Sequence, residues 1–198
     1  TDALGADISG ETIAVLEEGF DHPESKAAVT DKVESAVKVL EDLGADVTRV
    51  SVPAHHNAPA IAWLIWGYGS LQVFNQAGQI PHHDGWYNTD FTRIFSKCRT
   101  AAIDTLSPMV KATLLAMEYL DREHNALYGK AQNVGREIQR EYDDVLSKAS
   151  AILMPTTPGK PLRANPELSR VEQISRTFPP NKNTCPFAVT GHPTLSMP

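Results

Sequence analysis

The sequence predicts an α/β fold, and three consecutive features support this: a short apolar run rich in β-forming residues, an amphipathic helix, and a second apolar run after a glycine. The first run covers residues 12–16, the helix 24–43 and the second run 47–52. Two strands joined through one helix form a βαβ unit, whose strands are parallel and whose crossover is right-handed. We therefore expect a parallel pair of strands covered by a helix.

The helix predicted over 24–43 has apolar residues at three- and four-residue spacing, as on one face of an amphipathic helix. Pro23 suits the first turn of a helix, and Gly44 suits the position after its end, where a left-handed backbone is common. The apolar positions are Val29, Val33, Ala36, Val37, Leu40 and Leu43.

Two longer segments also have helical periodicity. In the first, 53–78, Gly67 and Gly69 are each unfavourable by about 1 kcal/mol relative to alanine. The second, 107–146, is predicted to be mostly helical. The apolar face of the first segment contains Ile61, Leu64, Ile65, Tyr68, Leu71 and Val73.

The remaining segments are predicted as loops around one more strand. Residues 79–90 contain proline, glycine and several polar residues, which favours a loop. Residues 151–154 form a third buried strand that Pro155 ends. Residues 156–182 are rich in proline and predict a long loop, with one helical turn near 171–174.

Composition describes an ordinary globular protein: of 198 residues, 41% are hydrophobic and 21% charged. The net charge of −6 disfavours a nucleic-acid partner, because such binding needs a concentrated basic face. The most apolar stretch, 58–68, is too short to span a bilayer, and no signal peptide is visible. Cys98 and Cys185 form neither a disulfide framework nor a metal-binding pair, so we expect a cytoplasmic protein.

The final segment carries the most specific motif. Residues 186–198 read Pro-Phe-Ala-Val-Thr-Gly-His-Pro-Thr-Leu-Ser-Met-Pro, which resembles the late motif of amidase-signature enzymes. Four earlier stretches are similar to that family in the family's own order, so the resemblance covers essentially the whole chain, and it is closest to bacterial amidases encoded beside nitrile hydratases. These stretches are 10–20, 40–47 followed by 50–53, 128–133 and 152–158.

This resemblance implies a fold and a function. The fold would be a single α/β region over 1–198: a βαβ-containing lobe of a mixed sheet covered by helices, incomplete at both ends. The family's catalytic Ser-cis-Ser-Lys triad lies upstream of anything in these residues, so no catalytic residue is assigned, and no cofactor is implied. Ala188 stands where the family usually has Asn or Asp, which removes a hydrogen-bonding group from the motif.

The resemblance also implies substrate-binding residues. Trp63 and Trp66 lie on a predicted helix that borders the acyl pocket in related amide hydrolases, and their spacing places them on one face. The competing interpretation is that both tryptophans belong to the core. Phe187, Thr190 and Gly191 are expected to form pocket wall.

The histidines suggest no metal site. Adjacent residues point apart, so His55-His56 and His82-His83-Asp84 each supply at most one good ligand, and we expect solvent-exposed loop histidines. We interpret His192 as fixing a turn rather than as a general base.

The sequence therefore predicts part of an amidase that hydrolyses carboxylic amides to acid and ammonia through an acyl-serine intermediate. This chain would form pocket wall and cover, and alone it would be inactive. Three alternatives stay open. The chain could associate with itself or with a chain bearing the catalytic segment, or it could bind amides without turnover. The amidotransferase branch, which acts on charged tRNA, is disfavoured by the acidic charge and the residues 190–193.

Overall fold

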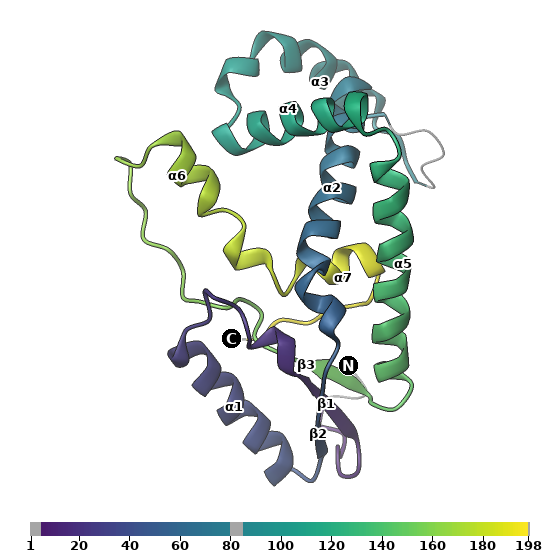
Figure 1. The fold of residues 1–198 in the computed structure, drawn as a ribbon, viewed down its shortest axis with the longest axis vertical. Coiled ribbons are helices and arrows are strands. Elements are labelled where there is room, and N and C mark those ends of the chain that lie inside the picture. The colour runs from purple at the N-terminus through teal and green to yellow at the C-terminus, as the bar shows by residue number, and fades with distance from the viewer. Residues whose placement is uncertain (1–4, 80–84, 198) are drawn as a thin grey trace.

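The computed structural model describes residues 5–79 and 85–197, and Figure 1 shows their arrangement. A small sheet lies at one end of the molecule, and paired helices extend away from it. The strands are β1 (Thr12–Leu16), β2 (Asp46–Val50) and β3 (Ala151–Leu153). The α-helices are α1 (Ala27–Asp42), α2 (Ala58–Asn75), α3 (Thr89–Ala101), α4 (Pro108–Glu123), α5 (Leu127–Leu146), α6 (Arg170–Ser175) and α7 (Cys185–Thr190). The 3-10 turns are η1 (Glu17–Gly19), η2 (Pro53–His56), η3 (Ile103–Thr105) and η4 (Pro179–Asn181).

The sheet is parallel and has the strand order β2-β1-β3. Ile13 on the central strand pairs with Val47 on one side and Ala151 on the other. Because β1 has a neighbour at each edge, the second half of its apolar run is completely buried. The predicted α/β class, with β1 and β2 joined through α1, is confirmed.

Helix α1 begins later than predicted. Pro23 lies outside it, because the backbone N–H of Lys26 donates to the carbonyl oxygen of Pro158 at 2.9 Å and holds the preceding residues in a turn. The helix then starts at Ala27. Its predicted end is confirmed, since Gly44 follows with a left-handed φ of 91°.

The second strand also ends earlier than the predicted 47–52. Strand β2 stops at Val50, and the backbone N–H of Val52 donates to the Glu18 carboxylate at 2.9 Å instead of to a neighbouring strand. Pro53 then starts η2, so the segment predicted as one helix over 53–78 consists of a 3-10 turn and α2.

Helix α2 is the centre of the helical layer and packs against α4, α5 and α7 (Figure 1). A Cβ at Gly67 would lie 2.8 Å from Sδ of Met117, so the absence of a side chain there permits the close approach of α2 and α4. Residues 107–146 form two helices, α4 and α5, separated by a short turn. Helix α3 was not predicted, and its first two residues, Thr89 and Asp90, come from the segment expected to be a loop.

Two apolar clusters stabilise the described part of the chain. One joins the sheet to α2 and α5 and contains Leu16, Val52, Ala58, Ile138 and Tyr142. The other joins α2 to α4 and contains Tyr68, Leu71 and Met117. Among residues 5–79 and 85–197, no helix has the length and apolarity that a membrane span requires.

Candidate functional site

Helix α7 carries three of the five predicted substrate-binding residues: Phe187, Thr190 and, just past its end, Gly191. Pro186 occupies the first turn, where its missing N–H costs nothing, and Gly191 ends the helix with a left-handed φ of 77°. Ala188 is exposed on this helix, so the helix forms without the amide or carboxylate that the family usually has there.

The Phe187 ring lies against the core. It stacks on Tyr142 of α5 with 5.0 Å between ring centroids, and His192 meets both rings edge-on. Helix α7 is therefore fixed to α5 through an aromatic cluster, which defines the orientation of its exposed surface.

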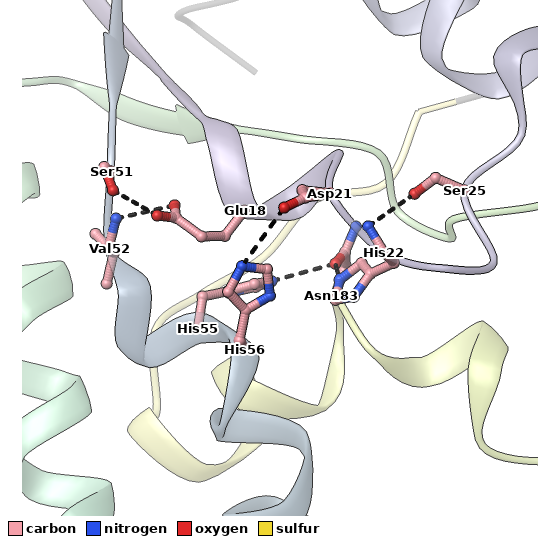
Figure 2. A network of polar contacts seen from close by, with 9 residues as sticks. All are labelled: Glu18, Asp21, His22, Ser25, Ser51, Val52, His55, His56 and Asn183. Atoms are coloured by element: carbon pink, nitrogen blue, oxygen red, sulfur yellow. Dashed lines mark hydrogen bonds and ion pairs between the residues drawn. The ribbon is translucent and has the colours of Figure 1, made fainter.

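Asn183, two residues before α7, is the centre of a buried polar network (Figure 2). Its side-chain Nδ2 donates to the carbonyl oxygens of Gly19 and Pro155, both at 2.7 Å. Its Oδ1 accepts from Nε2 of His22 at 2.7 Å and from Nε2 of His55 at 3.2 Å. Gly19 and Pro155 follow β1 and β3, so the network lies at the carboxyl ends of these parallel strands.

His55 extends this network to α5. Its Nδ1 lies 2.7 Å from the hydroxyl of Tyr142, and both side chains have no exposed surface. Burial lowers the pKa of His55, against a smaller opposing effect of the Asn183 hydrogen bond. Burial likewise raises the pKa of Tyr142, so both groups are neutral.

Glu18 makes a second link between the sheet ends (Figure 2). Its carboxylate accepts from the Ser51 hydroxyl at 2.5 Å and from the backbone N–H of Val52 at 2.9 Å. Burial acts to raise the pKa of Glu18, but these two hydrogen bonds outweigh it and hold the pKa below the usual range. Beside it, His56 faces Asp21 at 4.0 Å near the surface.

The expectation that both His55 and His56 are exposed loop residues is wrong for His55. Its ring is buried because η2 turns it toward Asn183 and Tyr142, while the side chain of His56 is 42% exposed. The pair His82-His83 with Asp84 lies outside the described residues. Within the part of the chain that the structure describes, no three side chains of metal-ligand type are grouped to hold an ion.

His192 joins α5 to the end of α7. Its Nε2 lies 3.1 Å from Oδ1 of Asp143, and its Nδ1 lies 2.8 Å from Oγ1 of Thr190. This carboxylate–imidazole–hydroxyl order resembles that of a nucleophilic triad, but Thr190 is buried, and an attacking hydroxyl needs access to substrate. The contacts agree with the prediction that His192 fixes the turn after α7.

Trp63 and Trp66 have different surroundings. Trp63 packs edge-on against Phe178, and its buried Nε1–H has no acceptor among the described residues. Trp66 is 65% exposed, so the interpretation that both tryptophans belong to the core is wrong for Trp66. The five predicted residues thus form two groups with different neighbours: Trp63 contacts Phe178, and Phe187 contacts Tyr142.

A groove of about 640 Å³ lies elsewhere, between the β1–β2 face and the end of α5. Its wall combines small apolar strand residues with charged helix residues and includes none of the five predicted substrate-binding residues. Among its lining residues are Ala14, Thr48, Val50, Glu141 and Lys148.

Sequence reasoning missed the Asn183 network. Asn183 lies three residues before the recognised motif of 186–198, and His55 follows a predicted strand, but their contact spans 128 positions in the chain. The available signal was that a histidine follows each of two predicted strands, His22 after 12–16 and His55 after 47–52. The carboxyl ends of parallel strands meet at one edge of a sheet, so these two side chains could be expected to lie close together.

Comparison with known proteins gives concordant results. A family model described as Amidase matches residues 4–198. An enantioselective amidase of Rhodococcus rhodochrous is 30% identical over 193 residues, which cover 96% of this chain and 37% of that enzyme. An uncharacterized protein from the nthA 5′ region of Rhodococcus erythropolis is 32% identical over 145 residues, which cover 69% of this chain and 72% of that protein.

A solved structure is also similar. A glutamyl-tRNA(Gln) amidotransferase subunit of Thermotoga maritima is 24% identical, with a TM-score of 0.46, and the match covers 92% of this chain and 35% of that chain. The chain therefore spans little more than a third of the length of the enantioselective amidase and of the Thermotoga protein.

Proposed function

This chain belongs to the amidase-signature family, and on that basis we propose that it forms pocket wall and cover of an enzyme that hydrolyses carboxylic amides to acid and ammonia. The family match over residues 4–198 is the observation that carries this proposal. The acidic net charge of −6 supports a small amide rather than a tRNA as substrate.

The proposed reaction proceeds through an acyl-serine. A serine on the family's catalytic segment, which these residues do not contain, attacks the amide carbonyl, and its proton passes to the leaving nitrogen. Ammonia departs, and water then hydrolyses the ester to release the acid and restore the serine. The part of this chain is to enclose the acyl group, so we expect the 198-residue chain alone to hydrolyse no amide.

The two groups of residues would contribute differently to that enclosure. Phe187, Thr190 and Gly191 would form a rigid wall, since the Phe187 ring is fixed by stacking on Tyr142. Trp63 would add a directional contact. Its buried Nε1–H without an acceptor among the described residues is costly, and the carbonyl oxygen of an amide would satisfy it.

The test measures ammonia released from aliphatic and aromatic carboxamides by material that contains both this chain and the catalytic segment. Hydroxylamine, which intercepts acyl-enzymes, should divert the product to a hydroxamate. Trp63→Phe removes one donor and should raise KM about fivefold, the equivalent of one hydrogen bond of about 1 kcal/mol. Trp86→Phe is the matched control, because Trp86 is 89% exposed and KM should not change.

Absence of both ammonia and hydroxamate with every carboxamide would contradict the proposal. Saturable binding of carboxamides without turnover would instead indicate the alternative of an amide-binding module. Turnover by the chain alone that a serine-reactive reagent abolishes would contradict the expected inactivity.

A second candidate role is assembly with another polypeptide that bears the catalytic segment, or with a second copy of this chain. The groove between β1, β2 and α5 supports it, because the partly exposed apolar residues Val50 and Val145 line it. Native mass spectrometry of the purified protein tests this. A complex with a chain that carries a Gly/Ser-rich segment, together with amide turnover, would support it, whereas a monomer near 21.6 kDa would count against it. A cytoplasmic location remains a prediction.

A further inference from the structure

The Asn183 side chain uses its whole hydrogen-bonding capacity. A primary amide has two N–H donors and one carbonyl oxygen with two lone pairs. Both donors bond backbone carbonyls, of Gly19 and Pro155, and both lone pairs accept from histidine rings, of His22 and His55. Three segments of the chain, which contain Gly19 with His22, His55 and Pro155, therefore meet at one side chain that is 2% exposed.

These contacts define the direction of each hydrogen bond. The amide cannot be reversed, because its NH₂ group must face the carbonyl oxygens of Gly19 and Pro155. Its oxygen therefore faces the two rings, and Nε2 of each histidine carries the hydrogen. In neutral His55 the other nitrogen, Nδ1, then accepts from the Tyr142 hydroxyl.

The hydrogen bonds of Asn183, His55 and Tyr142 also determine where α7 lies. Asn183 is joined to Cys185, the first residue of α7, by one residue, and α7 has six residues. On the far side of His55 from Asn183, Tyr142 donates to His55 and stacks on Phe187. The start of α7 and the Tyr142 ring against which Phe187 packs are thus connected by one series of hydrogen bonds, from Asn183 through His55 to Tyr142.

We propose that Asn183 is a positioning residue that fixes α7, and with it Phe187, Thr190 and Gly191, to the carboxyl ends of β1 and β3 and that orients the His55 ring with Nε2–H toward its own oxygen. This inference rests on the proposed function, because the residues that Asn183 would position are those proposed to form the wall of the amide pocket. Asn183 itself would touch no substrate, since all four of its hydrogen-bonding positions are occupied by groups of this chain.

Protonation of His55 would disrupt the arrangement. A hydrogen on Nδ1 would force the Tyr142 hydroxyl to accept instead of donate, so that hydroxyl would lose His55 as its acceptor, and the added charge would be buried. The ionisable groups around His55 and Asn183 offer little compensation for a positive charge on His55. Glu18 is engaged by Ser51 and Val52, and Asp21 faces His56. The others are His22, the Glu24–Lys182 pair, Glu141 beside Tyr142, and Cys185.

The experiment compares the chain with Asn183→Asp, which keeps the shape but replaces both donors by a carboxylate oxygen. Asn181→Asp is the matched control, since the Asn181 amide is exposed and donates to one carbonyl, that of Thr177. Two readouts are taken without substrate: histidine ¹⁵N shifts, which report tautomer and protonation, and amide hydrogen-exchange protection along the chain.

We expect His55 in the unmodified chain to be the Nε2–H tautomer near neutral pH. In Asn183→Asp its titration midpoint should rise by about one to three pH units, because a carboxylate then faces the ring. Protection of the α7 amides should fall about tenfold in this variant while β1 and β2 stay within about twofold. In the unmodified chain the same selective loss should occur as the pH falls from about 7 toward about 5.

A loss of protection that is equal in all elements would show that Asn183 contributes stability alone, and unchanged α7 protection would also overturn the inference. If Asn183→Asp does not fold, Tyr142→Phe replaces it. That variant keeps the stacking on Phe187 but removes the donor to Nδ1 of His55, so His55 should keep the Nε2–H tautomer that Asn183 imposes while α7 protection falls. Tyr128→Phe is its control, because the Tyr128 hydroxyl bonds Gln132 on the exposed face of α5.

Turnover separates this inference from the proposed function. In amidase that contains the catalytic segment, Asn183→Asp should raise KM more than it lowers kcat and should shift the acid limb of the kcat/KM profile. If no amide is hydrolysed but α7 responds as described, the proposed function fails and the positioning role stands. If amides are hydrolysed with unchanged KM and pH profile, the inference fails and the proposed function stands.

Discussion

The hydroxyl of Tyr142 lies 2.7 Å from Nδ1 of His55, with both side chains completely buried. The contact joins α5 to η2 across 87 positions of the sequence. It connects the aromatic cluster under α7 to the hydrogen bonds at the ends of β1 and β3. Because neither partner is charged, the link depends on His55 being the neutral tautomer that accepts at Nδ1.

Stability should therefore decrease as the pH falls below about 6.5, the usual pKa of histidine. Burial lowers the pKa of His55 in the folded state, so the unfolded chain binds more protons in this range and unfolding is favoured. The loss should level off once the pH lies below the folded-state pKa. Urea unfolding between about pH 8 and about pH 5 measures it, above the range in which carboxylates titrate.

The matched pair His55→Gln and His56→Gln identifies the group responsible. The first variant should flatten the pH dependence, while the second should leave it nearly unchanged, since the His56 side chain is 42% exposed whereas that of His55 is completely buried. Equal slopes in the two variants would assign the effect to other groups.

Glu18 should contribute more to stability than the ion pair of Glu34 with Arg49. Glu18→Gln leaves one accepting oxygen for the Ser51 hydroxyl and the buried backbone N–H of Val52 and replaces charge-assisted hydrogen bonds by neutral ones, so it should cost about 1–3 kcal/mol. Glu34→Gln disrupts a solvent-exposed pair and should cost about 0–1 kcal/mol. The free energy of unfolding in urea at neutral pH compares them, and equal costs would contradict the assignment.

Acidification should remove the contribution of Glu18 to stability. The hydrogen bonds from Ser51 and Val52 hold the pKa of Glu18 below its usual value, so its stabilisation is present at neutral pH. That stabilisation should be lost as the pH falls below about 4.5 and through the folded-state pKa, and Glu18→Gln should remove this part of the acid sensitivity.

Gly67 and Gly69 on α2 should respond oppositely to alanine. Both substitutions gain about 1 kcal/mol of helix propensity. At Gly67, however, the new Cβ would lie 2.8 Å from Sδ of the completely buried Met117, whereas at Gly69 no atom lies within 4 Å. We expect Gly67→Ala to be less stable than Gly69→Ala by about 1–3 kcal/mol, the cost of overpacking. Thermal unfolding of the pair provides the comparison, and equal stability would show that Met117 relaxes without cost.

Iodoacetamide should modify Cys98 long before Cys185. Cys98 is exposed, whereas burial raises the pKa of the Cys185 thiol to about 11. At about pH 8 that leaves roughly one thiolate in a thousand at Cys185, and the thiolate is the reactive form. Intact mass during alkylation should show one adduct, which Cys98→Ser removes. A first adduct at Cys185 would indicate that α7 opens readily.

Much of the fold could be predicted from local pattern. The apolar spacing in 27–42 and the β-branched runs on either side specify a βαβ unit, because periodicity reports which face of an element is buried. Helix α3 was missed, since none of its residues is buried and its periodic signal has no core beneath it. The motif around α7 identified the family from the order of its residues, and the predicted wall residues come from the same motif.

Other properties of the chain depended on contacts between distant segments. His55 and His56 are neighbours of identical chemistry, yet one is buried and the other exposed. Gly67 and Gly69 differ in the same way, as do Trp63 and Trp66. The sequence by itself determined the class of the fold, the family and the motif, because these depend on residue order and spacing. The tertiary structure alone decided which member of each pair is the more buried and that Asn183 joins three other segments to its own, because burial and hydrogen-bond satisfaction depend on packing between residues more than a hundred positions apart.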